Sequence, residues 1–470
     1  MRASRRVIIL GLDGVPPELL FQRWSKELPT FSKLAGSSLH GPLRSIDPPI
    51  TVPAWSCMVT SKDPGQLGCY GFRNRPDHSY RPMELADSTL VTEPTLWRIL
   101  SRKNMRSILI GVPQTYPPQP LRGLLAAGFL APDEQRDFTY PASFKEELDR
   151  ICNGYMIDVP SFRLQERSAL LKTVEEMTRK RFQAARHLIQ NQDWDFFMLV
   201  EMGPDRMHHG FWKFFDSRHP GHEPGNPFQE ALKSYYMLLD KELESILELL
   251  DPSDTLLVVS DHGARPMLGG VRINEWLRRR SLLKLKAEPQ EPTALEPSMV
   301  DWAETRVWSE GGYYARVFMN VKGREPMGKI QASDYERFRE DLACQIREME
   351  GPDSKPLGNR VLFPEQIYKL CRGVAPDLMV YLGDLDYRSI GTVGDGELFT
   401  SENDTGPDDA NHDPLGIYLL YEPWRSGGPS DGQREAHLLD VAPTVLDRLG
   451  LEVPQDMLGK PMGCQPGSLD

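Results

Sequence analysis

The sequence predicts an α/β fold in which a mostly parallel sheet is flanked by helices on both faces and interrupted by an inserted cap region. Two observations predict it. Apolar runs of strand length alternate with stretches whose apolar residues recur at helical spacing. Several of these runs also stop abruptly at residues that can bind a metal ion, and open α/β sheets bind their ligands at the carboxyl ends of the strands.

The first third of the chain supplies two strands and two helices. Residues 7–12 are wholly apolar and form the first predicted strand. Residues 53–61 suit a helix that is opened by a proline in its first turn, and residues 93–103 suit another. A short strand follows at 107–112, and the proline-rich stretch 113–119 ends it.

The middle of the chain repeats a helix-then-strand pattern twice. Residues 166–192 carry apolar positions at helical spacing and lead into a strand at 196–200. Residues 228–250 form a clear amphipathic helix and lead into a strand at 255–260. This alternation favours parallel strands joined by helices that cover the sheet.

The character of the sequence changes after residue 263. We therefore divide the chain into a core of residues 1–263 and 376–470 and an inserted cap or substrate region, residues 264–375. The insertion holds a predicted strand at 313–321 and a helix at 333–349.

The last part of the chain returns to the core. Strands are predicted at 376–382 and 415–421, and a final helix at 436–449 ends before Gly450, which suits a helix C-cap. The segments 113–165 and 385–410 are expected to be loops with local structure, some of it lining the site.

The overall composition sets broad limits on function. A chain of 470 residues with 40 % hydrophobic and 26 % charged residues is typical of a globular protein. The net charge of −12 argues against binding to a nucleic-acid duplex, and no apolar run approaches the roughly 18 residues of a membrane span. Six widely spaced cysteines without a C-x-x-C pair, and no signal-peptide pattern, predict free thiols and a cytoplasmic protein.

Metal-ligating residues recur where the predicted strands end. Asp13 alone could cap a helix, and His412 alone could be an ordinary loop histidine. Together, however, the acidic and imidazole side chains suit Zn²⁺ first and Mn²⁺ second, and they exceed what one four-coordinate ion needs. Two divalent ions form the usual clamp for phosphoryl displacement. The candidate ligands are Asp13, Asp205, His209, Asp261, His262 and His412, with His208 as an alternative to His209.

Thr51 is the candidate nucleophile. It stands just before the proline that opens the predicted helix, where the partial positive charge of a helix N-terminus attracts anions. A hydroxyl placed there beside a divalent metal can be deprotonated at neutral pH. The alternative is that Thr51 only caps the helix.

These residues lie in five ordered motifs that resemble the alkaline phosphatase superfamily, and within it the type I phosphodiesterase/nucleotide pyrophosphatase family. The motifs lie at Ile8–Gly14, Ile50–Trp55, Pro204–His209, Val259–Gly263 and Asn411-His412. The resemblance implies an alkaline phosphatase-like fold with Thr51 as nucleophile. It also implies that Asp13, Thr51, Asp261 and His262 bind one metal, and that Asp205, His209 and His412 bind the other. The D-x-x-x-H spacing favours His209 over His208.

The sequence departs from the family pattern beyond the nucleophile helix. Nucleotide pyrophosphatases carry there an asparagine that contacts a phosphate oxygen. In this chain Asn74 lies near but out of register, and Arg73 is an alternative anion contact. Both are candidate substrate-binding residues.

The expected function is a two-metal phosphoesterase that cleaves phosphodiester or pyrophosphate bonds through a phosphothreonine-type intermediate. Its partner would be a small phosphate ester, with nucleotides among the candidates; the oligomeric state is not readable. Two alternatives remain open. One is a phosphomonoesterase or phosphomutase of the same superfamily, and the other is a metal-binding scaffold with a retired site.

Overall fold

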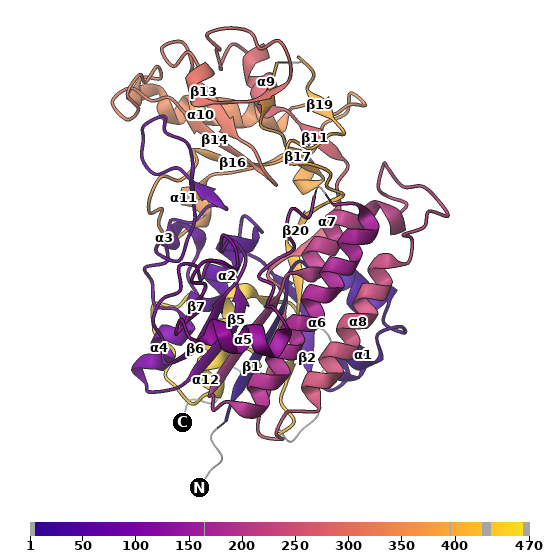
Figure 1. Cartoon of the computed structure of the whole chain (residues 1–470). Helices are drawn as coiled ribbons and strands as arrows, with labels where there is room; N and C mark the ends of the chain where they lie inside the picture. Colours follow the sequence, from indigo (N-terminus) through magenta and orange to yellow (C-terminus); the bar gives the residue numbers. More distant parts are fainter. Residues whose placement is uncertain (1–4, 164, 395, 425–433, 464–470) are drawn as a thin grey trace.

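A nine-stranded sheet forms the centre of the computed structural model, which describes residues 5–163, 165–394, 396–424 and 434–463 (Figure 1). The strands lie in the order β22-β2-β21-β9-β1-β8-β5-β6-β7. Their bounds are β1 Val7–Leu12, β2 Leu39–Arg44, β5 Ser107–Val112, β6 Gly123–Ala127, β7 Thr139–Tyr140, β8 Phe196–Glu201, β9 Thr255–Val259, β21 Leu415–Tyr421 and β22 Ala436–His437.

The middle of this sheet is parallel. Strand β1 pairs in parallel with β8 on one side and β9 on the other, and β5 pairs in parallel with β8 and β6. Every residue of β1, β5, β8 and β9 is buried, which explains why these strands appear in the sequence as continuous apolar runs. Strand β21 runs antiparallel to β9, and β2 runs antiparallel to β21.

Helices cover the two faces of the sheet in separate groups (Figure 1). Helices α6, α7 and α8 pack against one another, with α5 against α6 and α1 against α8, while α2 packs against α12 and α3. This is the predicted α/β architecture. The bounds are α1 Pro29–Ala35, α2 Thr51–Thr60, α3 Pro64–Leu67, α4 Leu96–Arg102, α5 Phe144–Cys152, α6 Arg167–Asn191, α7 Gly203–Phe215, α8 Ala231–Leu247 and α12 Val441–Arg448.

A second layer lies above the carboxyl edge of the sheet and has its own hydrophobic cluster (Figure 1). It contains a four-stranded antiparallel sheet, β13-β14-β16-β15, and a three-stranded sheet, β17-β11-β19. Its elements are β11 Gly269–Val271, β13 Val307–Glu310, β14 Ala315–Met319, β15 Arg360–Leu362, β16 Leu378–Tyr381, β17 Tyr387–Ser389, β19 Phe399–Thr400, α9 Ile273–Arg279, α10 Tyr335–Arg347 and α11 Pro364–Ile367.

The strand at 376–382 differs from its expected place. The sequence assigns it to the core sheet, but β16 pairs with β14 and β15 of the second layer. A short apolar run indicates a buried strand without indicating which sheet it joins, so this difference could not be foreseen. The division of the chain into domains stays a prediction.

Residues 73–85, which belong to the first core segment, also pack against the second layer. Their hairpin consists of β3 (Arg73–Asn74) and β4 (Glu84–Leu85). Tyr80 lies in the loop between them, and its ring stacks on Trp302 with centroids 3.9 Å apart. Arg75 forms an ion pair with Glu325 at 3.0 Å. Residues 73–85 are therefore anchored on the cap although they precede it in sequence by almost 200 positions.

Short elements complete the structure and adjust some predicted ends. The predicted helix at 436–449 divides into β22, a 3₁₀ turn and α12, and Gly450 follows with a φ of +71°. The remaining elements are β10 Gly263–Pro266, β12 Thr293–Ala294, β18 Thr392–Val393 and β20 Ala410–Asp413, a π-turn at Glu18–Arg23, and 3₁₀ turns at Pro297–Met299, Ala332–Asp334, Leu382–Leu385 and Leu438–Asp440.

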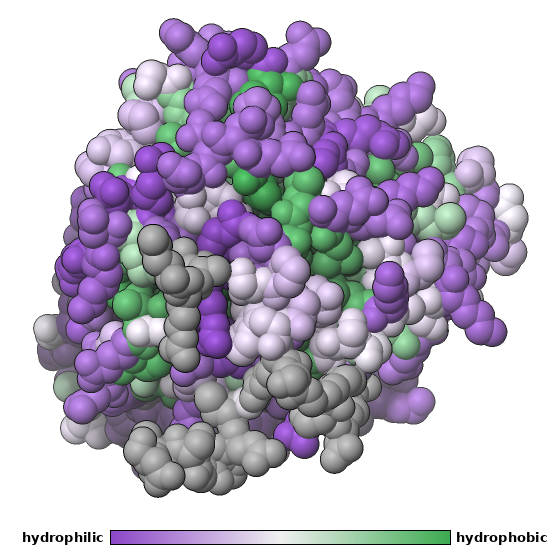
Figure 2. All heavy atoms as spheres, turned by 90° about the horizontal axis from the view of Figure 1, so that it is seen from below, coloured by the Kyte–Doolittle hydropathy of each residue, from purple (hydrophilic) through white to green (hydrophobic). Residues whose placement is uncertain are grey.

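The face on the side of the two termini is mainly hydrophilic where it is coloured (Figure 2). Hydrophobic residues lie there in stretches between hydrophilic ones. Within the described residues, no helix combines the length and apolar character that crossing a bilayer requires. Cys57, Cys69, Cys152, Cys344 and Cys371 are free thiols as predicted, and Cys464 lies outside the described residues.

Candidate active site

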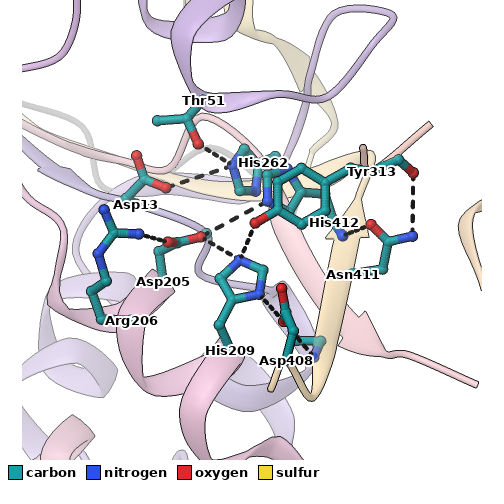
Figure 3. Close-up of polar contacts among 12 residues, drawn as sticks. Asp13, Thr51, Asp205, Arg206, His209, His262, Tyr313, Asp408, Asn411 and His412 are labelled. Atoms are coloured by element: carbon teal, nitrogen blue, oxygen red, sulfur yellow. Dashed lines mark hydrogen bonds and ion pairs between the residues drawn. The ribbon is translucent and has the colours of Figure 1, made fainter. Parts of the chain in front are cut away.

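The seven candidate ligands meet at the carboxyl edge of the core sheet, and Figure 3 labels all of them except Asp261. None of them is more than 4 % exposed. They are Asp13, Thr51, Asp205, His209, Asp261, His262 and His412.

Strand topology explains how residues so far apart in sequence reach one place. Asp13 directly follows β1, Asp261 comes two residues after β9, and Asp205 lies in the first turn of the helix that follows β8. These three strands are parallel neighbours, so their carboxyl ends share one edge. His412 lies on the short strand β20, just before β21, instead of following a strand of the core sheet. Because β21 is antiparallel to β9, the start of β21 lies at the same edge.

Asp13, Asp261 and His262 form the first ligand group. Their ligand atoms all lie within 4.8 Å of one another. Trp55 Nε1 donates to Asp13 Oδ2 at 2.6 Å, and the Gly14 N–H donates to Asp261 Oδ1 at 3.3 Å. The other oxygen of each carboxylate points inward, 3.5 Å (Asp13) and 3.3 Å (Asp261) from His262 Nε2.

Thr51 completes this group. It is the first residue of α2, the N-cap position is held by Ile50, and no side chain caps the helix. The Thr51 hydroxyl lies 3.2 Å from His262 Nε2. The structure therefore does not support the alternative in which Thr51 serves only as a cap, because its hydroxyl faces the ligand group.

Asp205, His209 and His412 form the second group. Asp205 Oδ1 lies 3.1 Å from His209 Nε2 and 3.9 Å from His412 Nε2. His262 also lies close to this group: one ligand atom each of Asp205, His262 and His412 lie within 4.8 Å of one another. The His262 ring stacks on His412 with centroids 3.7 Å apart. His209 Nε2 also faces the Tyr313 hydroxyl at 3.2 Å.

Every histidine of the site is oriented in the same way. Its Nδ1 contacts a carbonyl or carboxylate oxygen, which leaves Nε2 facing the other candidate ligands. This is the usual orientation of a metal-ligating imidazole. The contacts are His262 with the Gly263 carbonyl at 2.9 Å, His412 with the Pro49 carbonyl at 2.7 Å, and His209 with Asp408 Oδ1 at 2.6 Å. Burial alone would lower the pKa of His209, but Asp408, Tyr313 and Asp205 raise it well above its usual value, so a cation has to displace a proton from this ring.

The donor atoms fit divalent cations. Asp13 Oδ1, Asp261 Oδ2 and His412 Nε2 are buried and have no hydrogen-bond partner among the described residues, whereas buried polar atoms are normally satisfied. Burial raises the pKa of both Asp13 and Asp261, and a neighbouring carboxylate raises each further. Burial lowers the pKa of His262 to about 4, so its imidazole is neutral and able to bind a metal. Cations would satisfy all of these groups at once.

Three other residues considered from the sequence lie outside the ligand groups. His208 Nε2 pairs with the Tyr236 hydroxyl of α8 at 2.9 Å. Asn74 stabilises the turn at residues 70–74, since its Oδ1 accepts a hydrogen bond from the Tyr70 N–H at 2.7 Å and its Nδ2 donates one to the Gly71 carbonyl. Arg73 lines the cavity above Thr51.

Several residues around the site were not foreseen. Asp408 Oδ1 accepts from His209, while its Oδ2 accepts from Arg163 at 2.8 Å and Arg388 at 3.0 Å. Arg206 joins Asp205 to Asp158 with contacts of 2.7 Å and 3.0 Å. The only sequence signal for Arg206 is its place between Asp205 and His209.

The site opens into a cavity of about 320 Å³ between the core and the cap. Its walls combine aromatic rings, arginines and the Gly311-Gly312 turn of the cap. The lining residues include the candidate ligands Thr51, Asp205 and His412, together with Phe72, Arg73, Phe129, Phe162, Arg163, Arg206, Tyr313, Arg316 and Arg388.

Comparisons with known proteins agree with this geometry. The family model for type I phosphodiesterase/nucleotide pyrophosphatase matches residues 7–408. None of the curated proteins matches the sequence.

Solved structures share the fold at low identity. Human ectonucleotide pyrophosphatase/phosphodiesterase 5 is 13 % identical, with 96 % of each chain covered and a TM-score of 0.52. Phosphonoacetate hydrolase from Sinorhizobium meliloti 1021, in complex with phosphonoformate, is 13 % identical over 95 % of each chain with a TM-score of 0.58. An inactive murine ectonucleotide pyrophosphatase/phosphodiesterase 5 in complex with AMP has a TM-score of 0.51, at 13 % identity and 96 % coverage. These similarities confirm the predicted alkaline phosphatase-like fold.

Proposed function

The chain belongs to the type I phosphodiesterase/nucleotide pyrophosphatase family, and from this premise we propose a two-metal-dependent enzyme that hydrolyses phosphodiester or pyrophosphate bonds. Members of the family are phosphoester hydrolases, and the chain is an enzyme of this class. The observation that carries the finer proposal is the Thr51 hydroxyl, which is held inside the ligand group 3.2 Å from His262 Nε2.

We assign one cation to Asp13, Thr51, Asp261 and His262 and the other to Asp205, His209 and His412. When bound, two such cations favour the deprotonated hydroxyl and offset the negative charge that develops on the phosphate. Zn²⁺ is the first candidate and Mn²⁺ the second, because both accept mixed nitrogen and oxygen ligands.

In the proposed reaction Thr51 Oγ1 attacks phosphorus while the bond to the leaving oxygen breaks. Thr51 releases its proton to solvent, the leaving oxygen takes one up, and a phosphothreonine ester remains. Water then supplies OH to phosphorus and H to Thr51 Oγ1, which restores the enzyme.

The substrate is proposed to be a small phosphate ester. The cavity volume lies at the lower end of the range for small-molecule sites. A nucleotide is one candidate, since the related murine protein is described in complex with AMP. A phosphomonoesterase or phosphomutase would use the same groups, whereas the complete set of ligands speaks against a retired site.

Replacing the nucleophile tests the proposal directly. We expect Thr51→Ala to lower turnover of bis-p-nitrophenyl phosphate by about three orders of magnitude or more, and Thr51→Ser to keep measurable turnover because it keeps the hydroxyl. Thr89→Ala on an exposed loop is the control. Turnover of Thr51→Ala near that of the wild type would refute the assignment. A parallel assay with p-nitrophenyl phosphate separates diesterase from monoesterase.

A further inference from the structure

Five arginines line the active-site cavity, but only three of them are paired with carboxylates. Arg163 and Arg388 share Asp408, and Arg206 binds Asp158 and Asp205. The other two are Arg73 and Arg316. No carboxylate of the described residues lies within ion-pair distance of either one.

The guanidinium group of Arg316 is fixed without being neutralised. Arg316 lies on β14 of the cap, and it donates hydrogen bonds to the backbone carbonyls of Arg73 and of Gly311, the latter at 3.0 Å. These carbonyl groups carry no net charge, and the buried Nε of Arg316 has no hydrogen-bond partner among the described residues. These contacts also bring the hairpin residue Arg73 and the cap residue Arg316 to the same part of the cavity wall.

Glu310 is the carboxylate most closely associated with this pair, but it forms no ion pair with either arginine. Glu310 is the cross-strand partner of Arg316 in the β13–β14 ladder, yet it lines a different cavity together with Arg75 and Trp308. Burial raises the pKa of Glu310, whereas the charges of Arg316 and Arg73 act to lower it. Neither guanidinium group has a carboxylate of the described residues within ion-pair distance, so both remain available to an anion in the active-site cavity.

Arg73 and Arg316 thus present two guanidinium groups without a carboxylate partner to the active-site cavity. Arginine forks match carboxylate and phosphate groups and are a common means of binding them. The pair lines the same cavity of about 320 Å³ as Thr51. A small molecule that places a phosphate at Thr51 can therefore reach these arginines with another part of itself.

We propose that Arg73 and Arg316 form a subsite for a second anionic group of the substrate. The inference rests on the proposed function for the position of the first phosphate at Thr51. The substrate class becomes small phosphate esters whose remainder carries a carboxylate or a further phosphate, in preference to esters with a neutral remainder.

Calorimetric titration of the metal-loaded wild-type protein tests this subsite without requiring turnover. The probes are ethyl phosphate, 2-phosphoglycolate and ethylene glycol bisphosphate, which share a phosphate monoester and differ in the second group. We expect at least one of the two anionic probes to bind about tenfold more tightly than ethyl phosphate. The stronger of the two identifies the second group as carboxylate or phosphate.

Substitutions then locate the preference. The preference is the dissociation constant of ethyl phosphate divided by that of the tighter anionic probe. Arg73→Met and Arg316→Met should each reduce this ratio towards one. Arg316→Lys should reduce it partly, because lysine keeps the charge but lacks the two-pronged guanidinium group. Arg73 is exposed, so Arg73→Met gives an answer even where Arg316→Met fails to fold. Arg102→Met, an exposed arginine on α4, should leave the ratio unchanged.

The possible results separate the two proposals. Equal binding of all three probes by the wild type, or an unchanged preference in Arg73→Met, overturns the subsite. A preference that depends on Arg73 and Arg316, found in a protein that hydrolyses no ester, supports the subsite and refutes only the reaction.

Discussion

Asp408 is the residue on which the orientation of His209 depends. It accepts a hydrogen bond of 2.6 Å from His209 Nδ1 and binds two arginines with its other oxygen. Burial alone would raise the pKa of Asp408, but His209 and the two arginines lower it, so Asp408 stays charged. A charged partner at Nδ1 makes Nε2 a better ligand.

We therefore expect Asp408→Asn to weaken metal binding by about 10- to 100-fold, the usual effect of losing such a partner. Competition with a chromophoric chelator measures the affinity. Asp193→Asn, an exposed site, is the matched control. An affinity for both ions equal to that of the wild type would show that Asp408 has only a structural role.

Tyr313 is a cap residue that contacts two of the candidate metal ligands. Its hydroxyl accepts from Arg163 at 3.0 Å and faces His209 Nε2, while its ring stacks on His412 with centroids 4.0 Å apart. Tyr313→Phe keeps the stacking and removes the hydroxyl. We expect kcat to fall by about 10- to 100-fold, since a hydrogen bond to a charged group contributes about 1.5–3 kcal/mol.

Steady-state kinetics on a protein with verified metal content checks the effect of Tyr313→Phe. Tyr421→Phe, on β21 away from the site, is the control. If Tyr313→Phe changes metal content but leaves kcat per bound metal unchanged, the hydroxyl acts on the metals and not on the substrate.

Single residues can be predicted from the sequence where they directly end an apolar run. Asp13 and Asp261 stand out because each ends an apolar run, and the structure brings both to one place. Asp408 has no such mark, since it sits beside Asp409 in an irregular loop and only the fold selects one of the two. Tyr313 belongs to an element predicted as strand, whereas the strand begins two residues later and leaves Tyr313 in the turn.

At the scale of elements, β1 and α2 are in tight contact behind the site. A Cβ atom on Gly11 would lie 2.4 Å from the ring of Trp55 and 3.0 Å from Val200. Trp55 is fully buried, and its indole N–H holds Asp13. The glycine thus allows the helix that carries Thr51 to approach the strand that carries Asp13.

Gly11→Ala should lower the free energy of unfolding by about 1–3 kcal/mol, because an added methyl group overpacks a rigid core. It should also weaken metal binding through Trp55. Urea unfolding and metal titration measure the two effects. Gly36→Ala, where the new atom meets only ordinary contacts, should be nearly neutral. A Gly11→Ala protein as stable as the wild type would mean that Trp55 moves without cost.

The elements that sequence predicted best are those buried on both sides. The strands at β1, β5 and β21 have the predicted bounds because continuous apolar runs have clear limits. The last helix was predicted too long, since residues 436–440 carry helix-compatible side chains but join β2 as a strand and then form a 3₁₀ turn. The contacts of residues 436–440 with the rest of the fold, and not their helix propensity, therefore set their secondary structure.

At the scale of the whole molecule, the buried carboxylates place an electrostatic strain at the junction of core and cap. Asp13, Asp205 and Asp261 are all at most 4 % exposed, and they lie close together. Bound cations would relieve their repulsion and stabilise the native state by mass action.

Removing the metals with a chelator should therefore abolish hydrolysis and lower the unfolding temperature by several degrees. At a free metal concentration roughly 1,000 times Kd the stabilisation is about 4 kcal/mol. Differential scanning calorimetry with and without added Zn²⁺ or Mn²⁺ measures it, and the Thr51→Ala protein separates stability from turnover. Identical unfolding temperatures, with no ion found by elemental analysis, would contradict the two-metal assignment.

The anchoring of residues 73–85 on the cap has a practical consequence for protein engineering. A chimaera that exchanged only residues 264–375 with a relative would leave Tyr80 without Trp302 and Arg75 without Glu325. It would also separate Arg73 from the residue that binds its carbonyl. The transferable module is thus discontinuous. A graft of substrate preference from one relative to another has to carry the hairpin along with the insertion and β16, while the strand ends that hold the ligands stay with the recipient.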